Sequence, residues 1–167
     1  MMTVDAVVPL ASRLVTLFEQ ERVPYEVVTH QPTLTAQEAA ATAHVPGREL
    51  AKVVVLRDTN GGPFLVTLPA PCRLDMDAVA AVTGRSRPWL VRREDLASLF
   101  PDCEYGAVPP FGALYGMPLF VDACLARARH VFFTAGSIRQ VFGVRGEDFA
   151  RLVQAETDQF CFHPTGR

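Results

Sequence analysis

The sequence predicts an α+β fold, a single domain in which helices flank a mixed, largely antiparallel central sheet. The length of 167 residues, with 49% hydrophobic and 20% charged residues, suits one globular domain over residues 1–167 with a sizeable core. Strand-like and helix-like segments alternate irregularly, unlike the regular alternation of a doubly wound α/β fold. Turn-forming residues between neighbouring strands favour antiparallel pairing.

The central element is the apolar run of residues 51–58. Its β-branched residues are bounded by Gly47 and by the turn sequence of residues 60–63, which predicts a strand buried on both faces. The turn leads into a second apolar run, residues 64–68. We expect these two strands to pair as an antiparallel hairpin.

Helix signals mark the elements before this hairpin. A single apolar stripe, with Pro9 in its first turn, predicts a helix that ends near Glu21. The stripe is formed by Leu10, Leu14, Leu17 and Phe18. A strand over residues 25–30 follows, and the capping box from Thr35 to Glu38 predicts a short Ala-rich helix.

The elements after the hairpin are predicted in the same way. Asp75 caps a helix that Gly84 closes, and a further helix starts near Arg93 and stops at Pro101. The acids that follow Gly146 predict a final helix. Three further strands are expected, at residues 118–122, 130–134 and 138–144, with a tight turn at residues 135–137 and an edge strand in the tail at residues 159–163.

Charge and hydropathy exclude several classes of protein. A net charge of −2 and a pI of about 6.1 give no global basic field, so any contact with nucleic acid must be local, weak or shared with a partner. The apolar stretch of residues 6–11 is far too short to span a membrane, and no basic residue precedes it as in a signal peptide. We expect a cytoplasmic protein that does not bind membranes.

Lys52 is the charged side chain that interrupts the central strand. Side chains alternate faces with a period of two, so Lys52 shares a face with Val54 and Leu56. Two interpretations are open. The side chain either snorkels to water from the end of the strand or aims its ammonium group into a pocket.

A stiff loop is predicted at residues 105–112. Pro109 and Pro110 remove two amide donors, and Gly106 and Gly112 free the backbone. The loop is either an ordinary rigid connection or a set of fixed amides that hold a carbonyl oxygen or orient a water molecule. A site of the second kind needs no side-chain base.

Other catalytic and metal-binding patterns are absent from the sequence. There is no Gly-x-Ser-x-Gly elbow, no phosphate-binding Gly-rich loop and no His-Glu-x-x-His motif. The four cysteines form no Cys-x-x-Cys pair, and the histidines lack the spacing of metal ligands, so we expect no metal and no cofactor. The histidines are His30, His44, His130 and His163.

These residues, in this order, resemble the YbaK/EbsC family, which includes the editing domain of bacterial prolyl-tRNA synthetases and its free-standing relatives. The resemblance covers most of the chain. It is carried by the lysine strand at residues 50–55, the Gly-x-x-x-Pro loop at residues 106–112, the later signatures at residues 121–122 and 134–136, and the N-terminal pattern at residues 30–39.

The resemblance implies the editing-domain fold and an aminoacyl-tRNA deacylase that acts in trans. It implies three catalytic residues: Lys52, which binds substrate, and Gly106 and Pro110, which bound the loop whose amides meet the scissile carbonyl or the attacking water. The hydroxyl of the terminal ribose helps to orient that water. The implied substrate-binding residues are His30, Ala107, Val108, Pro109, Phe111, Gly112, Asp122, Thr134, Ala135 and Gly136.

The substrate implied by the resemblance is a tRNA mischarged with a small amino acid. Alanine, serine, threonine and cysteine stay open, because Val108 and Pro109 stand where many relatives have serine or glycine. A second hydrolytic sieve is useful here, since one binding pocket separates such amino acids by only about 1–3 kcal/mol. The alternative function is a non-catalytic module that binds an aminoacyl-adenosine-like or other small ligand.

The partners expected beside mischarged tRNA are an aminoacyl-tRNA synthetase or an elongation factor, because an acidic chain should bind tRNA weakly on its own. The densest basic cluster lies beside Trp89. It is either a solvated surface or the contact with acceptor-stem phosphates. Its members are Arg85, Arg87, Arg92 and Arg93.

Overall fold

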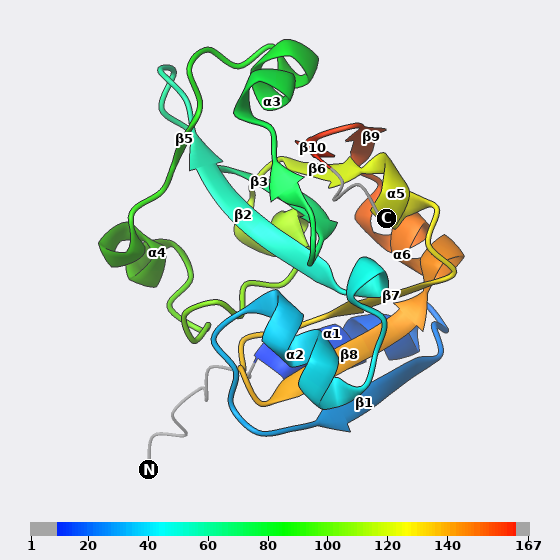
Figure 1. Ribbon diagram of the computed structural model, residues 1–167. Coiled ribbons are helices and arrows are strands. Elements are labelled where there is room, and N and C mark those ends of the chain that lie inside the picture. The colour runs from blue at the N-terminus through cyan, green and yellow to red at the C-terminus, as the bar shows by residue number, and fades with distance from the viewer. Residues whose placement is uncertain (1–9, 163–167) are drawn as a thin grey trace.

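A β-hairpin forms the centre of the structure, a computed structural model that describes residues 10–162 (Figure 1). Its strands, β2 (Ala51–Arg57) and β3 (Phe64–Pro69), pair antiparallel with Lys52 opposite Leu68. Every residue of β3 is buried, and every residue of β2 is buried or half-buried. The predicted central hairpin is therefore confirmed.

The remaining elements surround this hairpin in irregular alternation. Before it lie α1 (Leu10–Gln20), β1 (Tyr25–Thr29), α2 (Ala36–Ala43) and the 3-10 helix η1 (Gly47–Glu49). After it lie β4 (Arg73–Leu74), α3 (Met76–Thr83), β5 (Trp89–Leu90), α4 (Arg93–Leu99), the 3-10 helix η2 (Gly112–Tyr115), β6 (Leu119–Asp122), α5 (Ala123–Ala126), β7 (His130–Phe133), β8 (Gln140–Arg145), α6 (Gly146–Val153), β9 (Glu156–Asp158) and β10 (Cys161–Phe162). Over residues 10–162, no helix has both the length and the apolar character needed to cross a membrane.

The larger sheet has five strands in the order β5-β2-β3-β6-β9. β2 pairs antiparallel with both β3 and β5, whereas the pairs β3–β6 and β6–β9 are parallel. The smaller sheet has three antiparallel strands in the order β1-β8-β7. The predicted α+β fold with a mixed sheet is confirmed.

The two sheets meet at the start of β2. An isolated parallel bridge joins Leu50, the residue before β2, to Phe132 of β7. Ala39 and Ala40 of α2 belong to the same buried cluster as these two residues. In Figure 1, α2 accordingly lies over the lower end of β2, close to the smaller sheet.

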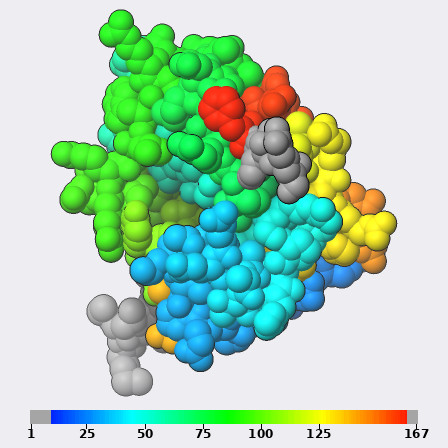
Figure 2. Space-filling view, in the orientation of Figure 1, coloured from blue at the N-terminus to red at the C-terminus, as the bar shows by residue number. Residues whose placement is uncertain are grey.

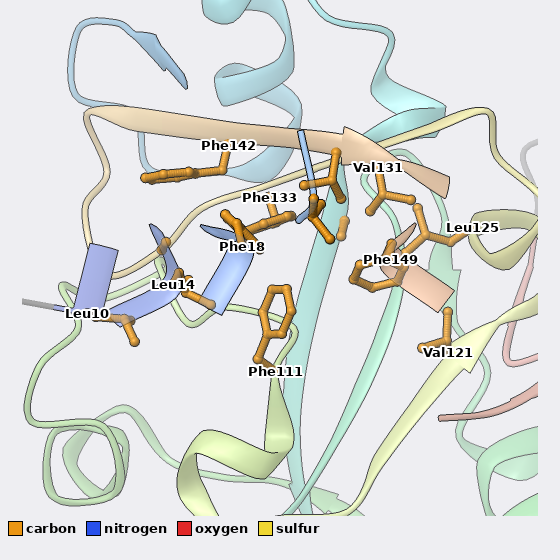
Figure 3. Packing of buried hydrophobic residues seen from close by; sticks show 14 residues of the cluster. Leu10, Leu14, Phe18, Phe111, Val121, Leu125, Val131, Phe133, Phe142 and Phe149 are labelled. Carbon is orange, nitrogen blue, oxygen red and sulfur yellow. The ribbon is translucent and has the colours of Figure 1, made fainter. Parts of the chain in front are cut away.

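The main hydrophobic core lies beneath the smaller sheet (Figure 3). Leu14 and Phe18 of α1 are fully buried there, and the Phe18 ring lies 6.3 Å from the ring of Phe133 in β7. Phe133 stacks on Phe142 of β8 at 6.1 Å, with the two ring planes inclined by 13°. The predicted apolar stripe of the first helix is thus the face that covers this sheet.

The capping signals act at the predicted helix starts, with one difference in detail. The Thr35 hydroxyl accepts a hydrogen bond from the Glu38 amide at 3.1 Å. The Glu38 carboxylate accepts from the Leu34 amide at 3.0 Å instead of the Thr35 amide that a standard capping box uses. The box therefore also fixes the chain two residues before α2, which matters because Leu34 lines the cleft described below.

The C-terminal strands differ from the prediction. The edge strand of the larger sheet is β9, which pairs in parallel with β6 and precedes the predicted segment 159–163. Within that segment, Cys161 and Phe162 form β10, which pairs with β4 outside the larger sheet, and His163 lies outside the described residues. All residues of β9 are exposed, so the strand has no apolar pattern that a sequence could display.

The predicted tight turn at residues 135–137 is a longer connection. Six residues, 134–139, separate β7 from β8. The backbone of Gly136 bonds to the loop of residues 104–107 and not across the hairpin. This contact brings the β7–β8 connection to the site.

Candidate active site

A cleft of about 300 Å³ opens where the two sheets meet. Its walls are the segment before α2 with the first turn of that helix, the start of β2, the loop at residues 105–108 and the β7–β8 connection. In Figure 2 the chain around α2 forms the blue front of the lower half, and α4 projects at the left in green. The lining residues are Thr33, Leu34, Thr35, Ala36, Ala39, Leu50, Ala51, Lys52, Val53, Tyr105, Gly106, Val108, Thr134 and Ile138.

The start of β2 presents an unpaired edge to this cleft. The neighbouring strand β5 pairs only with Leu56 and Arg57, and the Val91 amide donates to the Val55 carbonyl at 3.0 Å. Backbone groups along a strand point to alternate sides, so those of Val53 point to the same side as those of Val55. No strand within residues 10–162 pairs with this edge at Val53. The sheet therefore offers one amide and one carbonyl to a ligand.

The loop opposite this edge is fastened to the β7–β8 connection. The Gly136 amide donates to the Ala107 carbonyl at 2.8 Å, and the Glu104 amide donates to the Gly136 carbonyl at 2.8 Å. The Ala107 amide is used inside the loop, where it donates to the Glu104 carbonyl at 3.0 Å. The amides of Gly106 and Val108, two lining residues, donate to no protein acceptor in the described part of the chain. These two amides are available to a substrate.

The second half of the loop anchors it in the core and does not line the cleft. Four buried residues form this half: Pro109, Pro110, Phe111 and Gly112. The ring of Phe111 lies edge-on to Phe133 at 5.1 Å and 6.3 Å from Phe18. Figure 3 shows the three residues among the buried residues of the main core. The predicted catalytic Pro110 and its three predicted substrate-binding neighbours thus lie where they hold the loop, one layer below the cleft.

The ammonium group of Lys52 donates to the backbone carbonyl of Cys72 at 2.5 Å. Lys52 lines the cleft, but its side chain lies on the face of β2 that carries Val54. The loop packs on the opposite face, where Val53 and Val108 belong to one hydrophobic cluster. Burial lowers the pKa of the Lys52 ammonium, and two nearby thiols oppose part of this shift. The ammonium thus lies beside the cleft and is bonded to the β3–β4 connection. The sequence left open whether it reaches water or points into a pocket, and in the structure it meets a backbone carbonyl instead.

Of three predicted substrate-binding residues near the smaller sheet, one lines the cleft and two do not. Thr134 lines the cleft, whereas Ala135 is buried in the core behind it. His30 lies outside the lining, with its Nδ1 atom 2.6 Å from the Gln31 carbonyl oxygen. Its backbone amide donates to the Arg139 carbonyl at 2.8 Å, which closes the β1–β8 pairing.

Asp122 is fully buried and lies outside the cleft lining. Its carboxylate accepts hydrogen bonds from the amide of Cys124 at the start of α5 and from the amide of Phe160, both at 2.9 Å. The Cys161 thiol donates to the same carboxylate at 3.2 Å, and burial raises the pKa of this thiol. The geometry assigns Asp122 to the junction of β6, α5 and the C-terminal strands.

The predicted basic cluster is divided in the structure. Arg85 is tied to the hairpin, because its guanidinium pairs with the buried Asp58 carboxylate at 3.4 Å. Arg93 lies over the ring of Tyr105, 4.1 Å from the ring centre, at the edge of the cleft. The two others are exposed: Arg87 and Arg92. Of the four, Arg93 is the one placed next to the cleft.

The cleft lining contains no imidazole and no carboxylate among the residues that the structure describes. Its ionisable side chains are Lys52 and Tyr105, and its other polar side chains are threonine hydroxyls. Without a side-chain base, chemistry here depends on a positioned water molecule and on backbone donors that stabilise developing negative charge.

A polar cluster supports the loop from the side of α1. The Tyr115 hydroxyl donates to the Asp102 carboxylate at 2.9 Å, and Arg13 pairs with the same carboxylate at 3.6 Å. The Cys103 thiol lies 3.3 Å from the Tyr115 hydroxyl. Burial raises the pKa of Cys103 to about 11 and raises that of Tyr115 above its ordinary value.

We expect Cys103 to react slowly with iodoacetamide at pH 8. A pKa raised from 9.0 to about 11 leaves about a hundredfold less thiolate than an ordinary cysteine has at that pH. Labelling of the Cys103 peptide, followed by mass spectrometry, should therefore accelerate about tenfold per pH unit up to about pH 11. Equal rates for the native and the urea-unfolded protein at pH 8 would contradict this assignment.

The following lining residues were not predicted from the sequence: Thr33, Leu34, Thr35, Ala36, Ala39, Leu50, Ala51, Val53, Tyr105 and Ile138. They are brought together by contacts between distant segments, for which the sequence carries no local signal. The capping box at Thr35 was the one signal in the sequence that pointed to this segment, because it marks a fixed helix start. It does not show which loop faces that start.

Comparison with known proteins identifies a family and a related sequence. The model of the aminoacyl-tRNA editing domain family matches residues 30–152. The protein named multifunctional Ser/Thr-tRNA deacylase ProXp-y from Escherichia coli (strain K12) is 28% identical over 155 residues, which cover 89% of this chain and 90% of that protein.

Solved structures share the fold. Hypothetical protein APE2540 superimposes with a TM-score of 0.79 at 21% identity, covering 90% of this chain and 99% of that one. A candidate trans-editing enzyme for prolyl tRNA synthetase gives a TM-score of 0.77 at 22% identity, covering 95% and 100%.

The family match spans most of the chain and includes β2, the loop at residues 105–112 and the β7–β8 connection. The resemblance drawn from the sequence is confirmed. The predicted enzyme class, an aminoacyl-tRNA deacylase, agrees with this match. The chain belongs to the aminoacyl-tRNA editing domain family.

Proposed function

We propose that this protein hydrolyses the ester between a small amino acid and the terminal ribose of a mischarged tRNA, with serine and threonine as the favoured amino acids. The observation that carries the proposal is the cleft itself, in which two loop amides and a strand edge face each other without a side-chain base. The name of the Escherichia coli relative, a Ser/Thr-tRNA deacylase, supports the same chemistry.

The amides of Gly106 and Val108 are the proposed donors to the carbonyl oxygen of the ester. Attack of water on the carbonyl carbon places negative charge on that oxygen, and fixed amides stabilise the charge without reorganising. The free hydroxyl beside the ester on the terminal ribose orients the water. The bond between the carbonyl carbon and the ribose oxygen then breaks, and that oxygen takes up a proton. The products are the free amino acid and a tRNA with an intact terminal ribose.

Lys52 supplies positive charge at the wall of the cleft. Its ammonium has a long, flexible stem and can exchange the Cys72 carbonyl for an oxygen of the substrate. The cation is the form that binds, and burial lowers its pKa. The contribution of Lys52 should therefore be lost as the pH rises through that lowered pKa, before an exposed lysine would lose its charge.

The amino acid specificity is proposed to come from threonine hydroxyls. Thr134 lines the cleft, and its hydroxyl makes no hydrogen bond to protein in the part of the chain that the structure describes. A seryl or threonyl group would pair its own hydroxyl with it. A site built to pair a substrate hydroxyl discriminates strongly against a substrate that lacks one.

The test of the proposal is hydrolysis of a panel of alanyl-, seryl-, threonyl- and cysteinyl-tRNAs by the wild type, by Lys52→Ala and by Lys52→Arg. We expect seryl- and threonyl-tRNA to be cleaved fastest. Lys52→Ala should lower kcat/KM strongly, and Lys52→Arg should restore part of it, with circular dichroism showing an unchanged fold. If no ester is cleaved faster than in buffer, even with a synthetase or elongation factor added, the catalytic proposal fails and the small-ligand binding module becomes the better account.

Thr134→Val should lower hydrolysis of substrates whose amino acid carries a hydroxyl and leave that of alanyl-tRNA unchanged. The change keeps the shape and removes the hydroxyl, so we expect kcat/KM to fall about tenfold for seryl- and threonyl-tRNA and to stay unchanged for alanyl-tRNA. Thr157→Val on the exposed strand β9 is the matched control. An equal loss for all three substrates would show that Thr134 supports the cleft without reading the amino acid.

A further inference from the structure

A second cleft of about 120 Å³ adjoins the first and shares a wall with it. The shared wall is formed by Tyr105, Gly106 and Val108, which line both clefts. The far side is the face of α4 that carries Leu96, together with Phe100 just after that helix. A group attached to a ligand in the first cleft can therefore enter the second by passing over a single loop.

Tyr105 of the shared wall stacks with Arg93, which lines the second cleft. The guanidinium of Arg93 lies 4.1 Å from the centre of the Tyr105 ring, and Tyr105 is 52% exposed. An exposed ring stacked with a guanidinium is the combination by which proteins hold unpaired nucleobases, because every base has a flat π-face and the cation favours the adjacent backbone. Leu96 on the far side is half-buried and adds apolar surface for the base.

We infer that this second cleft binds the terminal base of the single-stranded 3′ end of the tRNA, stacked on the Arg93–Tyr105 pair. The inference rests on the proposed function, since it places the ester in the first cleft. The terminal base and the ester are attached to the same ribose, so a ribose seated over Gly106 puts its ester on one side of the loop and its base on the other. Tyr105 and Arg93 are thus substrate-binding residues, which hold the base equally before and during the reaction.

Stacking of the terminal base can be measured by fluorescence, without hydrolysis of an ester. A short unacylated oligonucleotide ending in CCA, with 2-aminopurine as the terminal base, should lose fluorescence on binding the wild-type protein. Tyr105→Ala should abolish the quenching and raise the Kd about tenfold, whereas Tyr105→Phe should keep both near the wild-type values. Arg93→Ala should weaken binding as well.

The control is Arg145→Ala, which removes an equal charge at the opposite end of the β7–β8 hairpin, where Arg145 forms an exposed pair with Glu147. We expect it to bind like the wild type. An oligonucleotide that lacks the terminal base should bind the wild type and Tyr105→Ala equally. The inference is overturned if the terminal base makes no difference to the affinity. It is also overturned if the Tyr105→Ala variant quenches the 2-aminopurine fluorescence and binds the oligonucleotide as the wild type does.

Kinetics separate this inference from the proposed function. With a seryl-tRNA substrate, Tyr105→Ala should raise KM and leave kcat nearly unchanged, because stacking is equally strong before and during the reaction. A fall in kcat alone would overturn the inference. If the wild type stacks the oligonucleotide yet cleaves no ester, the proposed deacylation fails while the base-binding cleft stands.

Discussion

Gly136→Ala is expected to lower the free energy of unfolding by about 3 kcal/mol or more, through backbone strain and overpacking combined. Gly136 has a φ of +86°, which side-chain-bearing residues rarely adopt, and a Cβ atom there would lie 2.9 Å from the Asp102 carbonyl oxygen. That oxygen belongs to the backbone and cannot turn away. Relief would require the bonds of Gly136 to Ala107 and Glu104 to lengthen, which displaces the loop at the cleft.

Gly61→Ala provides a matched control. Gly61 has a φ of +95° at the tip of the β2–β3 hairpin, but nothing lies within 4 Å of the Cβ position. Urea unfolding of both variants therefore separates the strain of the backbone from the clash with Asp102. We also expect Gly136→Ala to lose deacylation below its unfolding transition, and Gly61→Ala to keep it. Equal losses of stability in the two variants would refute the clash.

Phe111→Ala is expected to cost about 3–5 kcal/mol of stability, the usual range for truncating a buried aromatic ring. Phe111 is 4% exposed and lies 5.1 Å from Phe133 and 6.1 Å from Phe149. The loss should appear as a lower midpoint of urea unfolding. It should be accompanied by reduced hydrolysis under native conditions, because the amides of the loop lose the anchor that fixes them.

The control for Phe111→Ala is Phe162→Ala, which removes the same side chain at a site that is 62% exposed. Its effect should stay within about 0.5 kcal/mol. Phe111→Leu should fall between the two, since it keeps part of the buried volume. A Phe111→Ala variant that unfolds at the same urea concentration as Phe162→Ala would show that the ring does not anchor the loop.

Most of the fold could be predicted because its elements carry local signals. The apolar run of β2 and the turn residues before β3 identify a buried hairpin without any knowledge of its neighbours. Asp75 and Gly84 mark both ends of α3, which the structure confirms. The strand β9 was missed because it pairs through its backbone alone, and exposed polar residues carry no strand pattern.

The candidate site could be predicted only in part, for a related physical reason. The stiffness of the loop follows from Pro109 and Pro110, which act within their own segment. The acceptor of the Lys52 ammonium is a backbone carbonyl twenty residues away, and no side-chain identity reveals it. The sequence also could not show that Phe111 belongs to the core under β7, because a phenylalanine after two prolines suits a ligand pocket equally well.

The bonds between Gly136 and the loop have a consequence for cooperativity. One wall of the cleft, at Val53, belongs to the five-stranded sheet, whereas the loop that faces it is bonded at Ala107 to the connection of the three-stranded sheet. An opening fluctuation that separates the two sheets dismantles the cleft while each sheet keeps its own strand pairing. The population of the reactive state is therefore set by the free energy of docking one sheet on the other, a smaller quantity than that of global unfolding. Mutations far from the cleft that weaken this docking would lower the rate of hydrolysis while leaving most of the secondary structure in place.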